Sequence, residues 1–169
     1  MISKMNFSTL KKYLSFILFA SFIASVANAE ILNGTVVGVS DGDTITVIDK
    51  SNNEHKVRLM GIDAPEKSQT FGNEAKKTLS NYIYKKEVSV EYKKYDKYKR
   101  IVGKVTLDGQ DICLQMIREG MAWHFVQYEI EQSKTDRELY REAEAKAREV
   151  NIGLWVEKQA VSPWIFRQK

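Results

Sequence analysis

The sequence is poor in the residues that build disulfides and zinc sites. Cys113 is the only cysteine among 169 residues, so the chain can form no intramolecular disulfide. His55 and His124 are the only histidines, and they share no ligand spacing with the lone thiol, which argues against a zinc site. Cys113 lies in an apolar-periodic stretch and is predicted to be a small core residue. His124 is predicted to be a packed or surface histidine.

The chain also has no internal repeat, no low-complexity linker and no sign of a second domain. One uncharged apolar run, at 14–26, follows three lysines and precedes Ala27-Asn28-Ala29, which is the pattern of a cleavable signal peptide. The run is short for a membrane span, although a retained anchor is the alternative. We expect residues 1–29 to be the signal peptide and residues 30–169 to form one secreted or periplasmic domain, with no stable membrane association after cleavage.

Net charge is nearly absent once the signal peptide is removed. The chain has 26 basic and 22 acidic residues, but the first 29 residues hold three bases and no acid, which leaves 23 against 22. Overall charge therefore gives no argument for nucleic-acid binding. Locally, eight Lys and Arg residues gather between Lys85 and Lys104, interleaved with Tyr92, Tyr95 and Tyr98. Such a run is often a solvated face, but the tyrosines favour a surface that attracts phosphates and stacks bases.

Hydrophobic periodicity predicts five short strands and three helices. The predicted strands cover residues 31–39, 44–48, 56–62, 88–92 and 101–107. The predicted helices cover residues 71–86, 111–119 and 133–150, and the tail after 155 is expected to pack back as an irregular segment. This order indicates an α+β, mainly β, fold built on a small OB-type barrel, with another α+β arrangement as the alternative.

The stretch VRLMGIDAPE at 57–66 combines a predicted strand with three charges. Arg58 is the only charge within the apolar part, and Pro65 ends any strand ladder because it lacks an N–H group. A strand arginine is ordinarily solvent-facing or half of an ion pair. The succession of a cation, Asp63, a proline and Glu66 instead favours a functional site.

The stretch SDGDT at 40–44 joins two predicted strands. Asp41 and Gly42 suit a type I′ hairpin turn, because this pair supplies the positive φ angles of that turn. The turn does not require Asp43, a carboxylate at the start of a strand, where aspartate is disfavoured. If neighbouring strands bring Asp43 and Asp63 together, their oxygens suit a hard cation such as Ca²⁺ or Mg²⁺.

Arginines beside such a cation suit phosphodiester chemistry. Arg58 and Arg100 can grip phosphate oxygens and stabilise charge that develops in the transition state. Glu66 suits a general base that takes a proton from the attacking water, or else an acid at a helix N-terminus. Arg100 is otherwise one more surface cation of the basic stretch.

Three segments in this order resemble the staphylococcal-nuclease-like (thermonuclease) family: SDGDT at 40–44, VRLMGIDAPE at 57–66 and DKYKR at 96–100. The resemblance runs over residues 32–155. It implies an OB-fold five-stranded barrel with three helices. It also implies a monomeric Ca²⁺-dependent endonuclease that cleaves DNA and RNA with low sequence specificity, preferring single-stranded or locally melted sites. The alternative is a non-catalytic nucleic-acid-binding OB-fold module, which retention of the five charged site residues disfavours.

The resemblance also implies a role for each site residue. Asp43 and Asp63 look like carboxylate ligands of Ca²⁺, with the backbone carbonyl of Ala64 as a third ligand. The implied catalytic residues are Arg58 and Arg100, which bind the scissile phosphate, and Glu66, the general base.

Weaker matches extend the implied site beyond these residues. Lys97 and Tyr98 match positions that contact a terminal phosphate, and Tyr128 is expected near the nucleotide pocket. Lys99 departs from the family, which usually has glycine at this position. If the turn needs a positive φ angle, lysine strains it by roughly 1–2 kcal/mol.

Overall fold

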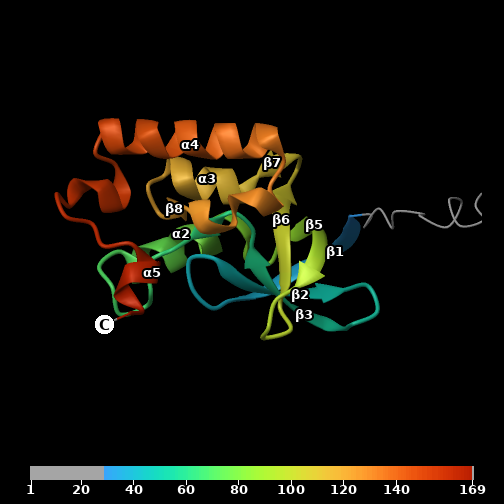
Figure 1. The fold of residues 1–169 in the computed structure, drawn as a ribbon. Helices are drawn as coiled ribbons and strands as arrows, with labels where there is room; N and C mark the ends of the chain where they lie inside the picture. The colour runs from blue at the N-terminus through green and yellow to red at the C-terminus, as the bar shows by residue number, and fades with distance from the viewer. Residues whose placement is uncertain (1–28, 169) are drawn as a thin grey trace, which may run out of the picture.

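Five strands of the computed structural model, which describes residues 29–168, close into a barrel (Figure 1). They are β1 Glu30–Val39, β2 Thr44–Asp49, β3 Glu54–Leu59, β5 Glu87–Tyr95 and β6 Ile101–Leu107. Four antiparallel pairings give the strand order β3-β2-β1-β5-β6. A parallel pairing between β3 and β6 closes the barrel. The predicted five-stranded OB-type barrel is confirmed. The predicted signal peptide lies outside the described residues, apart from its last one.

Three main helices accompany the barrel: α2 Gly72–Ile83, α3 Ile112–Arg118 and α4 Lys134–Glu149. Asp111 caps α3 by accepting a hydrogen bond from the N–H of Leu114, and Ser133 caps α4 by accepting from Asp136. In Figure 1, α4 runs alongside α3 at one end of the barrel. None of the helices in residues 29–168 has the length and apolar character needed to cross a membrane.

The remaining elements are short. They are β4 Ile62–Asp63, β7 Gln110–Asp111, β8 Trp123–His124, the 3₁₀ helices η1 Val126–Glu131 and η2 Gly153–Val156, and α5 Pro163–Phe166. The tail was predicted to be irregular, but it forms the single turn of α5, which begins at Pro163, a favourable first helical residue.

Several boundaries differ from the prediction. The strand predicted at 56–62 breaks at Gly61, which adopts a φ of 76° and lies against Gln132. Ile62 and Asp63 therefore form the separate strand β4, which pairs with β8. The strand predicted at 88–92 continues to Tyr95 because the pairing of β5 with β6 extends to Tyr95, opposite Ile101. The helix predicted at 71–86 ends at Ile83, and Lys85 then adopts a φ of 61°.

The barrel interior is apolar and supports the strand ends that carry the charged residues. Each of the five strands contributes a fully buried side chain, among them Val36, Ile45, Val57, Val90 and Val105. Cys113 is buried as predicted, and burial raises the pKa of its thiol to about 12. His124 is also packed inside, where its ring lies 2.9 Å from the side-chain oxygen of Gln132.

Candidate active site

One cavity of about 730 Å³ lies beside the start of β2, the end of β3 and the turn after β5. All nine residues predicted to form the site line it: Asp43, Arg58, Asp63, Ala64, Glu66, Lys97, Tyr98, Arg100 and Tyr128. Asp41, Phe125 and Arg167, which the sequence analysis did not assign to the site, line it too. The volume is within the range typical of ligand pockets.

The loop between β1 and β2 places Asp43 without a type I′ turn. Neither Asp41 nor Gly42 has a positive φ angle, so the turn type suggested by the sequence is wrong. The Asp41 carboxylate instead accepts a hydrogen bond from the N–H of Asp43 at 3.0 Å. Glycine is required at 42 for space, since a Cβ there would lie 2.6 Å from the Cβ of Ala64 and 2.7 Å from that of Ala75. The loop can therefore pack directly against Ala64 and α2.

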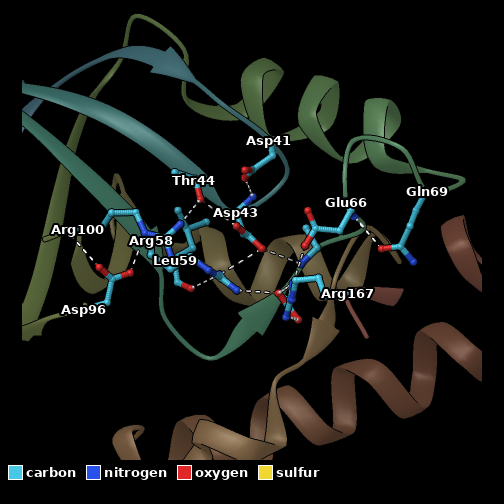
Figure 2. Close-up of polar contacts among 12 residues, drawn as sticks. Asp41, Asp43, Thr44, Arg58, Leu59, Glu66, Gln69, Asp96, Arg100 and Arg167 are labelled. Carbon is cyan, nitrogen blue, oxygen red and sulfur yellow. Dashed lines mark hydrogen bonds and ion pairs between the residues drawn. The ribbon is translucent and has the colours of Figure 1, made fainter. Parts of the chain in front are cut away.

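Arg58 brings two buried carboxylates to one guanidinium group (Figure 2). Its Nη1 lies 3.2 Å from Oδ2 of Asp43, and its Nη2 lies 2.8 Å from Oδ1 of Asp63. Asp43 also accepts hydrogen bonds from the N–H of Ala64 at 2.8 Å and from the hydroxyl of Thr44 at 3.1 Å. These contacts fix both carboxylates relative to the end of β3.

Arg100 is held by a turn built around Asp96. One oxygen of Asp96 accepts hydrogen bonds from the N–H groups of Tyr98 at 2.8 Å and Arg100 at 2.9 Å. Its other oxygen accepts from Nε of Arg100 at 2.7 Å. Burial acts to raise the pKa of Asp96, but the bonds from Arg100 and Tyr98 outweigh it and lower that pKa. Lys99 has a φ of 63°, so the backbone conformation that disfavours lysine is present in this turn.

Aromatic rings line part of the cavity, and those of Tyr98 and Tyr128 are exposed. The side chain of Tyr98 is exposed, and the Lys97 ammonium lies 5.0 Å from its ring centroid. The Tyr128 ring lies 4.8 Å from that of Phe125, which stacks on Trp164 at 5.5 Å. Such faces can stack against nucleobases.

Arg167 reaches the carboxylates from the far end of the chain, after α5. Its Nη2 lies 2.8 Å from Oδ2 of Asp63, and its Nη1 lies 2.6 Å from Oε1 of Glu66. Figure 2 shows Arg167 and Glu66 beside each other. Because 101 residues separate the two, no local sequence pattern signals this contact.

The sequence of this chain matches known proteins over most of its length. The family model described as staphylococcal nuclease homologue matches residues 56–157. An uncharacterized endonuclease of Haemophilus influenzae is 42% identical over 134 residues, which cover 79% of this chain and 72% of that protein. A micrococcal nuclease of Shigella flexneri is 37% identical over 155 residues, which cover 86% of each chain. The chain belongs to the staphylococcal nuclease family.

This membership fixes the broad activity. The chain is an endonuclease of the staphylococcal nuclease family, whose members typically depend on Ca²⁺. A staphylococcal-like nuclease of Arabidopsis thaliana is 32% identical over 113 residues, which cover 67% of this chain and 33% of that protein. The matched span of the family model includes Arg58, Glu66 and Arg100, whereas Asp43 lies before it.

The charges at one end of the cavity suit a divalent cation. The acidic residues gathered there are Asp41, Asp43, Asp63 and Glu66. Within residues 29–168, Arg58 and Arg167 are the cations that pair with them, so negative charge is in excess. Burial, followed by the charge of Asp43, raises the pKa of Asp41 to about 6. Burial also raises the pKa of Asp63, against the lowering effect of Arg167 and Arg58.

The acidic side chains at this end offer a metal ion oxygen ligands, which Ca²⁺ prefers. Within residues 29–168, no three Asp, Glu, His or Cys side chains stand close enough together to enclose a metal ion. A cation here therefore needs main-chain oxygen as well as carboxylates. The main chain of Ala64 lies beside one of these carboxylates, since the Ala64 N–H donates a hydrogen bond to Asp43 at 2.8 Å.

Proposed function

We propose that this endonuclease is Ca²⁺-dependent and hydrolyses phosphodiester bonds of DNA and RNA with low sequence specificity. One observation supports the proposal above all others: Arg58, Arg100 and Glu66 line the same cavity as the two buried aspartates. The exposed rings of Tyr98 and Tyr128 favour single-stranded or locally melted substrates, because unpaired bases can stack on them whatever their identity.

Asp43, Asp63 and the carbonyl of Ala64 would hold the calcium ion. When bound, the ion polarises the phosphoryl group and offsets the charge of the reacting phosphate. The hydrogen bonds from Ala64 and Thr44 keep the Asp43 carboxylate in place, so little reorganisation is needed when the substrate enters.

Arginine and glutamate side chains bind the phosphate and transfer the proton. Arg58 and Arg100 bind oxygens of the scissile phosphate and stabilise the extra negative charge of the transition state. The Glu66 carboxylate accepts a proton from the water that attacks phosphorus. Lys97 and Tyr98 contact a neighbouring phosphate, and Tyr128 lies beside a base.

The enzyme works as a secreted or periplasmic monomer in this proposal. The lysines, the apolar run and Ala27-Asn28-Ala29 support removal of residues 1–29 as a signal peptide. Mass determination of the N-terminus of the exported protein tests this part, with Glu30 as the expected first residue.

Cleavage of single-stranded DNA, duplex DNA and RNA, with Ca²⁺ and with a chelator, tests the activity. The double variant Arg58→Ala, Glu66→Ala serves as the control for a contaminating nuclease. We expect cleavage that requires both Ca²⁺ and the two residues, fastest on single strands. Binding of DNA without any cleavage by the wild type would instead favour the non-catalytic module.

A further inference from the structure

The C-terminal segment places a guanidinium group on the acidic end of the cavity. Nη2 of Arg167 lies 2.8 Å from Oδ2 of Asp63, while Nη1 lies 3.3 Å from Oδ1 of Asp63 and 2.6 Å from Oε1 of Glu66. In the proposed function, Asp63 is a calcium ligand and Glu66 is the general base. Arg167 therefore bonds the oxygens that the reaction needs.

A cation that binds Asp63 directly must share this carboxylate with two guanidinium groups. Its Oδ1 accepts from Arg58 at 2.8 Å, its Oδ2 accepts from Arg167, and the side chain is only 1% exposed. Because like charges repel, a calcium ion on this carboxylate favours displacement of one guanidinium group. The choice falls between Arg58 and Arg167.

Arg167 is the group that can move. Arg58 lies in β3 with a side chain 14% exposed, and it also bonds Asp43 and the carbonyl of Leu59. The Arg167 side chain is 44% exposed and follows the single turn of α5. Moving Arg58 would disturb the barrel wall, whereas moving Arg167 requires only the tail to shift.

Two other contacts show that the tail is built against the site. The Gln69 side chain accepts a hydrogen bond from the N–H of Glu66 at 2.8 Å and donates one to the carbonyl of Val161 at 2.9 Å. Trp164 stacks on Phe125 beside the cavity. The segment 161–167 thus packs against residues next to the cavity, which Arg167 itself lines, and a shift of Arg167 is transmitted to these neighbours.

We propose that Arg167 competes with the divalent cation for Asp63 and Glu66, so that cation binding releases the Arg167 side chain and loosens segment 161–167. This inference rests on the calcium site of the proposed function. Arg167 acts as an internal cation that stabilises the metal-free site and lowers the apparent affinity for calcium. Calcium binding then uncovers Glu66 for its role as a base.

Isothermal titration calorimetry with Ca²⁺ on the purified exported protein tests the competition without measuring activity. We expect Arg167→Ala to bind calcium about three- to tenfold more tightly than the wild type, as for the loss of partly exposed ion pairs. Arg167→Lys keeps the positive charge but loses the two-pronged guanidinium group, so its calcium affinity should lie between those of the wild type and Arg167→Ala. Lys158→Ala removes a positive charge from an exposed position of the same tail and should match the wild type.

Trp164 reports the movement of the tail. Its fluorescence, taken as the difference between the wild type and Trp164→Phe, should change on calcium addition, and Arg167→Ala should show the changed signal before any calcium is added. Equal calcium affinities for the wild type and Arg167→Ala would overturn the competition and leave the calcium site standing. If no variant binds calcium, both the competition and the proposed Ca²⁺ dependence are wrong.

Discussion

Arg58 and Arg100, the two arginines proposed to bind the scissile phosphate, are held by different kinds of contact. Arg58 pairs with Asp43, which lies before β2, and with Asp63 in β4, so its position depends on several elements of the barrel. Arg100 is held chiefly by Asp96, which lies only four residues before it in the same turn. One arginine is thus fixed by the fold and the other by a local turn.

This difference separates stability from activity. Changes around Arg58 disturb buried charges and close packing, so they should lower stability and activity together. Changes around Arg100 disturb an exposed turn, so they should lower activity while the barrel remains folded. The four predictions below test this separation, from the largest expected effect to the smallest.

Replacing Arg58 should have the largest effect. Arg58→Ala removes a transition-state donor, so kcat on single-stranded DNA should fall by about two to three orders of magnitude. The change also leaves the buried Asp43 without its ion-pair partner and leaves Asp63 with Arg167 alone, so urea unfolding should show a stability loss of about 3 kcal/mol without calcium. Lys56→Ala, an exposed position of the same strand, is the control. Wild-type kcat in Arg58→Ala would refute the assigned role.

Adding a methyl group at Gly42 should damage the site through packing alone. Gly42→Ala places a Cβ within 2.7 Å of Ala64 and Ala75, so we expect a loss of about 1–3 kcal/mol in stability. Calcium affinity should weaken too, since the clash pushes Asp43 away from Ala64. At Gly38, by contrast, an added Cβ meets its nearest neighbour, Thr46, at 3.4 Å, which makes Gly38→Ala the matched control. Unfolding curves that coincide for both variants would show that the loop tolerates the clash.

Loosening the turn around Arg100 should affect activity more than stability. Asp96→Asn removes the charge that bonds Nε of Arg100, so we expect kcat/KM to fall about tenfold, as for loss of charge-assisted positioning. Thermal unfolding at neutral pH should change little, because the turn is at the surface. A drop in stability as large as that of Arg58→Ala would contradict the separation of the two regions.

Placing glycine at position 99 should have the smallest effect. Lys99→Gly removes the cost of holding lysine at a φ of 63°, partly offset by the greater freedom of glycine in the unfolded chain. We expect a gain of about 0.5–1 kcal/mol in unfolding free energy and kcat within about twofold of the wild type. Asn52→Gly tests the same conformation far from the cavity, at a φ of 62°. Reduced stability in Lys99→Gly would show that the lysine side chain contributes contacts that outweigh the strain.

Much of the site could be predicted because its residues sit in short, ordered motifs. The strands on either side of SDGDT and before DKYKR showed clear period-two patterns, and the barrel brings these segments to one cavity. The turn at Gly42 was misjudged, because an Asp-Gly pair signals positive φ, whereas here glycine is needed for the close approach of Ala64 and Ala75. That requirement comes from packing between segments that are distant in the sequence, so the residues next to Gly42 do not reveal it.

The contact of Arg167 could not be predicted for a similar reason. It joins Asp63 to a residue 104 positions later, and the tail carries no periodic pattern that places it at the cavity. The break at Gly61 is also tertiary in origin, since Gln132 fills the space where a side chain at 61 would lie. Contacts between distant segments decided each of these features.

Single-turnover cleavage of a single-stranded oligonucleotide by wild type and Glu66→Gln, in calcium and with enzyme in excess, tests the account most directly. Binding of the oligonucleotide is measured in parallel. We expect the variant to bind the oligonucleotide about as well as the wild type but to cleave it at least about a hundredfold more slowly, because amide replaces the base. Equal cleavage rates would show that the cavity does not use Glu66 and would contradict the mechanism.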